Sequence, residues 1–316
     1  MGTPTYEDLT AKQTLNRVKD THMPFDWSIN PYRGCFHGCS FCYARATHSF
    51  LGMEADDSFQ SHIFVKRNAA VAMKIQLANL MRKFHGNRNA VARRVGLVAI
   101  GTATDPYQPI EGKAKLTRQC LEVLSGYGIP VTITTRSPLV LRDLDLLEKM
   151  NIVSVNISIS TLNRKVCRGL EPAAPYPVRR LEIVRKLMEH NVPSGIFMAP
   201  ILPCLSDSAA DMEELICAAK ENEALFVSPS VLRLAPEVKE WFFHMLKDHY
   251  PQLLSAYMGL YQGAYPNAAY VATLMNRVNR LLDRYGFTGQ GLDLSYQRAA
   301  KRDQSKSQGE QLSFSF

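Results

Sequence analysis

Short apolar runs rich in β-branched residues alternate with amphipathic helical stretches between about residue 27 and residue 235. The runs predict six strands, at Trp27–Asn30, Gly96–Ile100, Val131–Thr135, Val153–Ile159, Ser194–Met198 and Phe226–Ser230. Helical periodicity between them is clearest in three series: Val71, Ile75, Leu80 and Phe84; Leu116, Cys120 and Leu124; and Leu181, Val184, Leu187 and Met188. This alternation is typical of β/α units around a parallel sheet.

Six such units are fewer than the eight of a full barrel, so we expect an α/β fold with a smaller, barrel-like sheet. An open, doubly wound sheet fits the same pattern. Beyond Pro236 the pattern predicts helices alone, and from Gly289 the sequence turns polar. We therefore expect an N-terminal arm (1–24), a barrel (25–235), a helical cap (236–288) and a disordered tail (289–316).

The composition is that of a globular protein, with 46% apolar and 21% charged residues in a chain of 316. No stretch is long and apolar enough for a membrane helix, and the first thirty residues lack a secretory signal pattern, so we expect a cytoplasmic protein. Three of the seven cysteines, Cys35, Cys39 and Cys42, crowd into eight positions. In a reducing compartment this crowding favours binding of a metal or cluster over disulfides.

The net charge of +8 comes from one segment of the chain. The segment from Ser58 to Thr104 has no acidic residue and eight basic ones: Lys66, Arg67, Lys74, Arg82, Lys83, Arg88, Arg93 and Arg94. Such a region can attract a polyanion such as nucleic acid. A solvated helix face with a basic loop explains the run equally well.

The cysteine triplet lies in a loop directly after the first predicted strand. Gly34 and Gly38 allow the backbone to fold tightly enough for three thiolates to converge. Iron–sulfur clusters are held by cysteine thiolates, whereas structural zinc takes four ligands, so three cysteines leave one position that His37 could fill. A zinc site would need a second ligand pair, but Cys120, Cys167, Cys204 and Cys217 are single in sequence.

The Cys-x3-Cys-x2-Cys spacing, with an aromatic residue before the last cysteine and Tyr43 after it, resembles the radical S-adenosylmethionine (SAM) superfamily. The resemblance implies a [4Fe–4S] cluster on Cys35, Cys39 and Cys42 whose fourth iron binds SAM. Reduction would then yield a 5′-deoxyadenosyl radical that removes hydrogen from substrate, with flavodoxin or ferredoxin as the electron donor. It also implies a partial (β/α)6 barrel, in agreement with the six predicted strands.

The wider sequence is similar to the spore photoproduct lyase-like group, often labelled DNA repair photolyase. The similarity rests on the segments 29–35, 42–45, Thr102 to Pro109 (Thr-Ala-Thr-Asp-Pro-Tyr-Gln-Pro) and 170–172. It implies lyase chemistry on a DNA lesion. Spore photoproduct lyases have a tyrosine before the last cluster cysteine, where this chain has Phe41.

Three residues are candidates for catalysis. Cys204 follows the fifth predicted strand and Cys167 the fourth, at the carboxyl end of the sheet, where sites of α/β folds gather. Either could give a hydrogen atom to a substrate radical, although a buried or incidental thiol is the plainer interpretation of each. Tyr43, directly after the last loop cysteine, is the third candidate. Cys120 and Cys217 have helical spacing and are expected to pack.

Residues that follow the strands are candidates for SAM contacts: Thr102, Thr104, Asp105, Tyr107, Gln108, Arg136, Ser158 and Ser160. Thr104 or Asp105 could receive the methionine ammonium group, and Ser158 and Ser160 suit a ribose. Asp105-Pro106 is also a common turn starter, and serine or threonine there often caps the next helix.

Basic and aromatic residues would surround the same opening: Arg45, Arg136, Arg164, Lys165, Arg168 and Arg233, with Tyr43, Tyr107 and Tyr176. Guanidinium groups beside aromatic rings suit a phosphate backbone and an unstacked base. The ordinary alternative for Arg164 and Arg168 is an ion pair with Glu171.

The last residues, from Gln311 to Phe316, resemble the peptide by which bacterial proteins bind the replication sliding clamp. A frayed terminus is the alternative. Three hypotheses follow: a radical SAM enzyme acting on nucleic acid, in DNA lesion repair; the same chemistry on RNA, protein or a small metabolite; and a non-enzymatic, metal-stabilised nucleic-acid-binding module.

Overall fold

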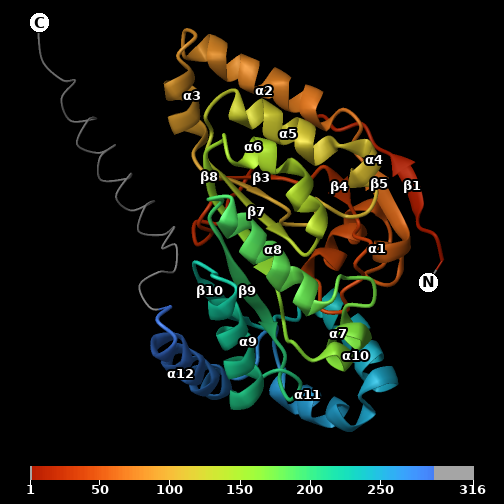
Figure 1. The fold of residues 1–316 in the computed structure, drawn as a ribbon. Helices are drawn as coiled ribbons and strands as arrows, with labels where there is room; N and C mark the ends of the chain where they lie inside the picture. The colour runs from red at the N-terminus through yellow and green to blue at the C-terminus, as the bar shows by residue number, and fades with distance from the viewer. Residues whose placement is uncertain (1, 288–316) are drawn as a thin grey trace, which may run out of the picture.

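The computed structural model describes residues 2–287, and its largest element is a sheet of seven strands (Figure 1). The strands lie in the order β10-β9-β8-β7-β6-β3-β2. Their bounds are β2 Asn16–Arg17, β3 Trp27–Ile29, β6 Val98–Ile100, β7 Val131–Thr135, β8 Ile152–Ser158, β9 Ser194–Ile201 and β10 Val227–Val231. All neighbours pair in parallel except β2, which is antiparallel to β3.

The six predicted strands are confirmed as β3 and β6 to β10. They are hydrogen-bonded in chain order, without the reversal that defines a doubly wound sheet. The fold is therefore the expected partial barrel, with β10 at one edge and β2 at the other. Parallel order places the carboxyl ends of all six strands on the same side of the sheet.

A second, three-stranded sheet was not predicted from the sequence. It has the order β1-β5-β4, with β1 at Thr5–Asp8, β4 at Tyr32–Arg33 and β5 at His62–Val65. The strand β1 makes the expected N-terminal arm a paired part of the fold, and β4 leads directly into Gly34 and Cys35. This small sheet therefore fixes the start of the cysteine loop.

Helices cover the main sheet, and of the last three, α12 lies beside α9 while α10 and α11 lie near α7 (Figure 1). The α-helices are α1 Ser58–Ser61, α2 Ala69–Lys83, α3 Arg88–Val95, α4 Glu111–Ala114, α5 Leu116–Ser125, α6 Leu144–Leu147, α7 Arg164–Leu170, α8 Pro177–Glu189, α9 Ala209–Glu221, α10 Pro236–His249, α11 Leu254–Leu260 and α12 Ala268–Arg284. Three 3-10 helices, η1 Tyr43–Leu51, η2 Pro138–Asp143 and η3 Pro251–Leu253, connect them.

The predicted apolar face of α2 is wrong at its first two positions, whereas Leu80 and Phe84 are partly buried against the core. Val71 and Ile75 are 58% and 59% exposed, while Ala72, Met73 and Leu77 are buried. Small alanines let α2 lie close to its neighbours, and this displaces the buried face from the larger apolar side chains. In α5 and α8 the predicted apolar faces are confirmed, and in α5 Cys120 is fully buried, as is Leu124.

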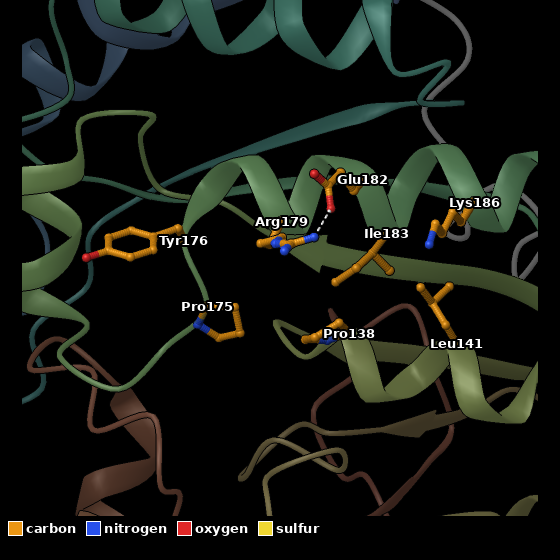
Figure 2. A pocket seen from close by; sticks show the side chains of 8 residues that line it. All are labelled: Pro138, Leu141, Pro175, Tyr176, Arg179, Glu182, Ile183 and Lys186. Atoms are coloured by element: carbon orange, nitrogen blue, oxygen red, sulfur yellow. Dashed lines mark hydrogen bonds and ion pairs between the residues drawn. The ribbon is translucent and has the colours of Figure 1, made fainter.

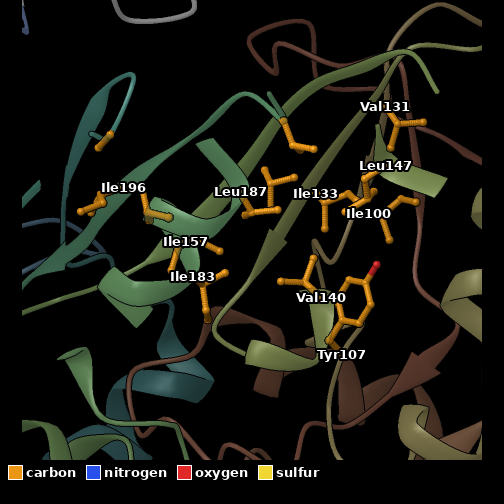
Figure 3. Packing of buried hydrophobic residues seen from close by; sticks show 14 of the residues in the cluster. Ile100, Tyr107, Val131, Ile133, Val140, Leu147, Ile157, Ile183, Leu187 and Ile196 are labelled. Atoms are coloured by element: carbon orange, nitrogen blue, oxygen red, sulfur yellow. The ribbon is translucent and has the colours of Figure 1, made fainter. Parts of the chain in front are cut away.

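One large apolar core lies between the sheet and its helices. Figure 3 shows Ile100, Ile133 and Ile157 from three neighbouring strands, with Leu187 from α8. A second cluster joins α10 and α11 to the cysteine loop, because Phe41, Phe242 and Tyr257 pack together there. The C-terminal helices therefore cover the loop as well as extend the chain.

No helix among residues 2–287 has the length and hydropathy needed to cross a bilayer. The expected disordered tail and its sliding-clamp motif, Gln311 to Phe316, lie outside the described residues.

A buried ionic network ties the start of the loop to the helical layer. Glu111 is fully buried and accepts hydrogen bonds from the Tyr32 hydroxyl, from the Thr117 backbone N–H (3.0 Å) and from Arg142 Nη2 (2.8 Å). Buried charges of this kind are stable only with all partners present.

We expect Glu111→Gln to lower the free energy of unfolding by about 3–5 kcal/mol, because the neutral amide breaks the buried ion pair with Arg142, which then keeps only Asp143 as a carboxylate partner. Denaturant titration measures the change. Arg185→Gln is the control, since it removes an exposed pair with Glu189 and should change stability by less than about 1 kcal/mol. Equal losses in the two variants would contradict the importance of the network.

Candidate functional site

The cysteine loop runs from Gly34 to Cys42 between β4 and η1. Gly34 has φ +81°, and a Cβ there would lie 2.7 Å from the His62 carbonyl oxygen. Gly38 has φ +66°, and a Cβ there would overlap the side-chain amide of Gln60. Both positions require glycine, as the sequence analysis expected.

The three loop cysteines are free thiols gathered on one loop. Cys35 and Cys39 are only 8% and 5% exposed. Cys42 packs against two apolar clusters, one that contains Cys35 and one that contains Cys39. Burial, opposed by Arg136 and reinforced by Glu171, raises the pKa of Cys39 to about 12. Binding of a metal at Cys39 must therefore displace the proton from its thiol.

The donor set fits a cluster better than a single ion. Among residues 2–287, no three metal-ligating side chains are placed to hold one metal ion. The thiolates of an iron–sulfur cluster each bind a different iron and do not need to meet at one point.

Arg45 holds the loop in place. Its fully buried guanidinium donates from Nε to the Cys39 carbonyl (2.9 Å), from Nη2 to the Gly38 carbonyl (2.8 Å) and from Nη1 to the Asp56 carbonyl. The rings of Phe59 and Trp241 lie 5.5 and 5.0 Å from its Cζ. Arg45 was expected at the opening, facing phosphate. That expectation was wrong, because all three of its donor nitrogens bond to backbone.

Asp105 also stabilises the loop. Its Oδ1 accepts from Thr135 Oγ1 (2.7 Å) and from the Tyr107 backbone N–H (2.9 Å), and its Oδ2 accepts from the Arg136 backbone N–H (2.8 Å). His37 Nδ1 lies 3.2 Å from Oδ2, and both side chains are buried. Burial alone would raise the pKa of Asp105, but His37 and the hydrogen bonds outweigh it and lower the pKa to about 2.

Thr104 and Gln108 contact the other side of the loop. Thr104 Oγ1 donates to the Gly34 carbonyl (2.5 Å), and Gln108 Oε1 accepts from the Phe36 backbone N–H (3.1 Å). Thr102 lies beside Asn30, which precedes the loop in the chain. The Asn30 side-chain amide donates to Thr102 Oγ1 (2.9 Å). The Thr-Asp-x-Tyr-Gln segment therefore braces the cysteine loop.

Tyr107 is fully buried in the main core, next to Val140 (Figure 3). Ser158 and Ser160 are buried at the carboxyl end of β8, and Ser160 Oγ donates to Glu171 Oε1 (3.1 Å). The structure thus brings most of the predicted SAM-contact residues to one end of the sheet but places Tyr107 behind it.

A charged triad, of which the sequence analysis named Arg136 and Glu171 but not Arg180, lies beside the loop. Glu171 is fully buried, is paired with Arg180, and has Arg136 Nε 3.6 Å from its Oε1. Arg136 acts on the thiols of Cys39 and Cys42, both of which raise its pKa. The motif Leu170-Glu171-Pro172 marked the carboxylate, but Arg180 occupies an ordinary helical position and had no such signal.

Unsatisfied buried polar atoms gather around the loop. Within the described chain, Ser40 Oγ and both ring nitrogens of His48 have no hydrogen-bond partner. Among the same residues, His37 Nδ1 and Arg136 Nε form no hydrogen bond either, and have only their ion-pair contacts to Asp105 and Glu171. Because buried polar groups are nearly always paired, this concentration indicates a site that receives a polar or charged group.

The catalytic candidates have different settings. Cys167 is buried on α7, with Sγ 3.4 Å from the Thr161 carbonyl oxygen, and shares Arg136 and Glu171 as charged neighbours with Cys39. Cys204 is exposed after β9, in the left-handed region at φ 60°. Tyr43 is exposed and donates its hydroxyl to the Thr102 carbonyl.

Basic side chains on α7 surround one tyrosine. The guanidinium carbons of Arg164 and Arg168 lie 4.5 and 4.4 Å from the centre of the Tyr176 ring. The alternative interpretation of Arg164 and Arg168, an ion pair with Glu171, was wrong, because Arg180 and Arg136 pair with that carboxylate. Arg233 lies farther along the chain, over Tyr265 at 5.7 Å.

We expect Arg45→Lys to lose most of the iron that the wild-type protein holds after anaerobic reconstitution. Lysine keeps the charge but cannot reach three carbonyls at once. The measurement is iron and sulfide per chain, with Arg179→Lys, an exposed position, as control. Full iron content in Arg45→Lys would show that the loop holds its shape without the clamp.

His48 should make stability depend on pH. Burial, then the charges of Arg33 and His62, lower its pKa to about 4 from the usual 6.5. The unfolded chain therefore binds a proton that the folded chain refuses, so stability present at pH 7 is lost as pH falls below 6.5.

Between pH 7 and pH 5, protonation of His48 should lower the free energy of unfolding of the wild-type protein by about 2 kcal/mol. The total decrease over this range should be smaller by that amount in His48→Phe. Anaerobic denaturant titrations at the two pH values measure it. An identical pH dependence in the two proteins would contradict a neutral, buried His48.

Comparison with known proteins places this site in a family. The model of the Radical SAM superfamily matches residues 29–216. An uncharacterized protein of Mycobacterium tuberculosis strain H37Rv is 31% identical over 290 residues, which cover 90% of this chain and 82% of that protein. A Radical SAM Nalpha-GlyT isomerase of Pseudomonas phage M6 is 23% identical over 198 residues, covering 62% of this chain and 38% of that protein.

Solved structures share the fold. A spore photoproduct lyase variant with bound AdoMet and dinucleoside spore photoproduct has a TM-score of 0.61 at 16% identity, covering 90% of this chain and 79% of that one. SuiB of Streptococcus suis bound to precursor peptide SuiA has a TM-score of 0.51 at 18% identity, covering 81% and 46%. The family model spans the cysteine loop and the strands β4 to β9, and the chain belongs to the radical SAM superfamily, whose enzymes use a [4Fe–4S] cluster and SAM.

Proposed function

We propose that this radical SAM enzyme acts on nucleic acid and that its reaction repairs a DNA lesion. Membership of the superfamily favours an enzyme over a metal-stabilised binding module. The choice of nucleic acid as substrate is carried by one observation, the exposed arginines of α7 that flank Tyr176 at the carboxyl side of the sheet.

Cys35, Cys39 and Cys42 would hold three irons of the cluster. When bound, the cluster and SAM supply a 5′-deoxyadenosyl radical that removes hydrogen from substrate. The protein's part is to hold the loop through Arg45 and Asp105, and to balance the negative thiolates with Arg136.

The residues for SAM divide into two groups. Thr104 and Gln108 bond to the loop backbone, and Asp105 contacts the loop through His37, so we propose that they act by positioning it. Ser158, Ser160 and Arg136 lie at the carboxyl ends of β8 and β7. Arg136 Nε forms an ion pair with Glu171 but no hydrogen bond within the described residues, and is the proposed donor to a carboxylate of SAM.

The α7 arginines suit a polyanion. Within residues 2–287 neither Arg164 nor Lys165 forms an ion pair, and Arg168 donates to the Pro172 carbonyl. Uncompensated cations beside an aromatic ring bind phosphates and unstacked bases. RNA, a protein or a small metabolite is the alternative substrate, and the peptide-bound structure of the same fold supports a protein most directly.

Cys167 and Cys204 remain the proposed hydrogen donors. A thiol in this role breaks its S–H bond as a C–H bond forms on the substrate radical. Cys167 has the site's charged groups around it, whereas Cys204 has the exposure that a substrate requires. An electron donor such as flavodoxin or ferredoxin would reduce the cluster, and the sliding-clamp interaction stays a prediction.

Anaerobic formation of 5′-deoxyadenosine tests the proposed function. We expect reconstituted enzyme with SAM and a reductant to form more of it with ultraviolet-damaged DNA than with intact DNA, and Cys35→Ala to form none. Cys217→Ala is the matched control, because that thiol lies on α9 beside Glu221. Stimulation by a peptide or metabolite but by no nucleic acid would refute the proposed substrate.

A further inference from the structure

A surface cleft of about 460 Å³ lies between η2 and α8 (Figure 2). Its apolar lining consists of Pro138, Leu141, Pro175 and Ile183. The volume falls within the usual range of ligand pockets, about 300–1,000 Å³. None of the catalytic candidates lines it.

The cleft begins close to the reactive site. Pro138 follows Arg136 by two residues after β7, and Pro175 accepts a hydrogen bond from Arg180 Nε (2.7 Å) on its carbonyl. Arg136 and Arg180 are the two partners of Glu171. The residues that begin the cleft are therefore tied to the charged groups beside the cysteine loop.

The rim of the cleft is basic. Tyr176, Arg179 and Lys186 line it together with Glu182, which pairs with Arg179 through Nη1 at 2.9 Å. Figure 2 shows the Tyr176 ring extending away from the cleft toward α7, where Arg164 and Arg168 lie against it. The cleft itself thus carries Lys186 and the Arg179–Glu182 pair, and the Tyr176 ring connects it to Arg164 and Arg168 on α7.

This combination selects a ligand. An apolar floor takes a flat, uncharged ring, and the surrounding guanidinium groups take a negative charge attached to that ring. An acidic peptide supplies the negative charges but has no flat ring next to each of them. A nucleotide presents both in the required order, base and then phosphate.

We propose that the cleft holds an unstacked base of a nucleotide that flanks the reacting one, with the adjoining phosphates on Arg164 and Arg168. The inference rests on the proposed function and adds to it a second base site outside the reactive cavity. A base can enter the cleft only after it leaves its stack. The enzyme should therefore bind single-stranded nucleic acid more tightly than duplex of the same sequence.

Binding of a fluorescent single-stranded oligonucleotide to the anaerobically reconstituted protein tests this. Leu141→Trp fills the cleft and should weaken binding about tenfold with little change in salt dependence, because the phosphate contacts remain. The double variant Arg164→Gln, Arg168→Gln should weaken binding by a similar factor and reduce the slope of log affinity against log salt by about 1 to 1.5.

The matched control removes two charges elsewhere. Lys83→Gln with Arg88→Gln changes the basic surface of α2 and α3, and should leave affinity within about twofold. The α7 double variant alters only exposed side chains, so it keeps the test valid if Leu141→Trp is poorly folded.

The outcomes separate the two proposals. Wild-type binding with no loss in the cleft and α7 variants would overturn the base site and leave the proposed function standing. Equal losses in the control would show general charge attraction and also overturn it. Competition by an acidic peptide as strong as that by the oligonucleotide would assign the cleft to protein. If wild type binds no nucleic acid, the proposed function fails, and the base site fails with it.

Discussion

The buried guanidinium of Arg45 is the contact on which the site depends. It joins the Gly38 and Cys39 carbonyls to the Asp56 carbonyl and so fixes the bend that carries three thiols. Thr104 and Gln108 brace the same bend from the opposite side through hydrogen bonds to its backbone, and Asp105 contacts it through the His37 side chain. A loop of this length has no secondary structure to satisfy its own backbone groups, so side chains from distant segments must do so. The charge of Arg45 also offsets thiolates that burial alone would keep protonated.

Strands buried on both faces were predictable, because their apolar runs are continuous and bounded by glycine or proline. The cysteine loop was also predictable, because spacing and glycines are local properties. The sheet of β1, β4 and β5 was missed because four-residue strands carry too little pattern. The roles of Arg45 and Asp105 could not be predicted, since their partners are defined only by the fold. Both were identified as site residues, and in each the hydrogen bonds go to protein groups instead of ligand.

In the described part of the chain, charged side chains are paired in the interior of the site and unpaired at its surface. Beside the thiols, Arg136 and Arg180 share the buried Glu171, so the interior of the site is nearly balanced. On α7 the arginines lie over an aromatic ring and face solvent. A balanced interior costs little to bury, whereas uncompensated cations at the rim attract anions. This separation explains how one end of the sheet can hold a charged cofactor and still recruit a polyanion.

Electron paramagnetic resonance of the reduced protein, with and without SAM, tests the central claim most directly. A cluster held by three thiolates with one open iron should give a [4Fe–4S] signal whose shape changes when SAM is added. A signal that ignores SAM, or a protein that binds zinc and no iron under anaerobic purification, would contradict the account.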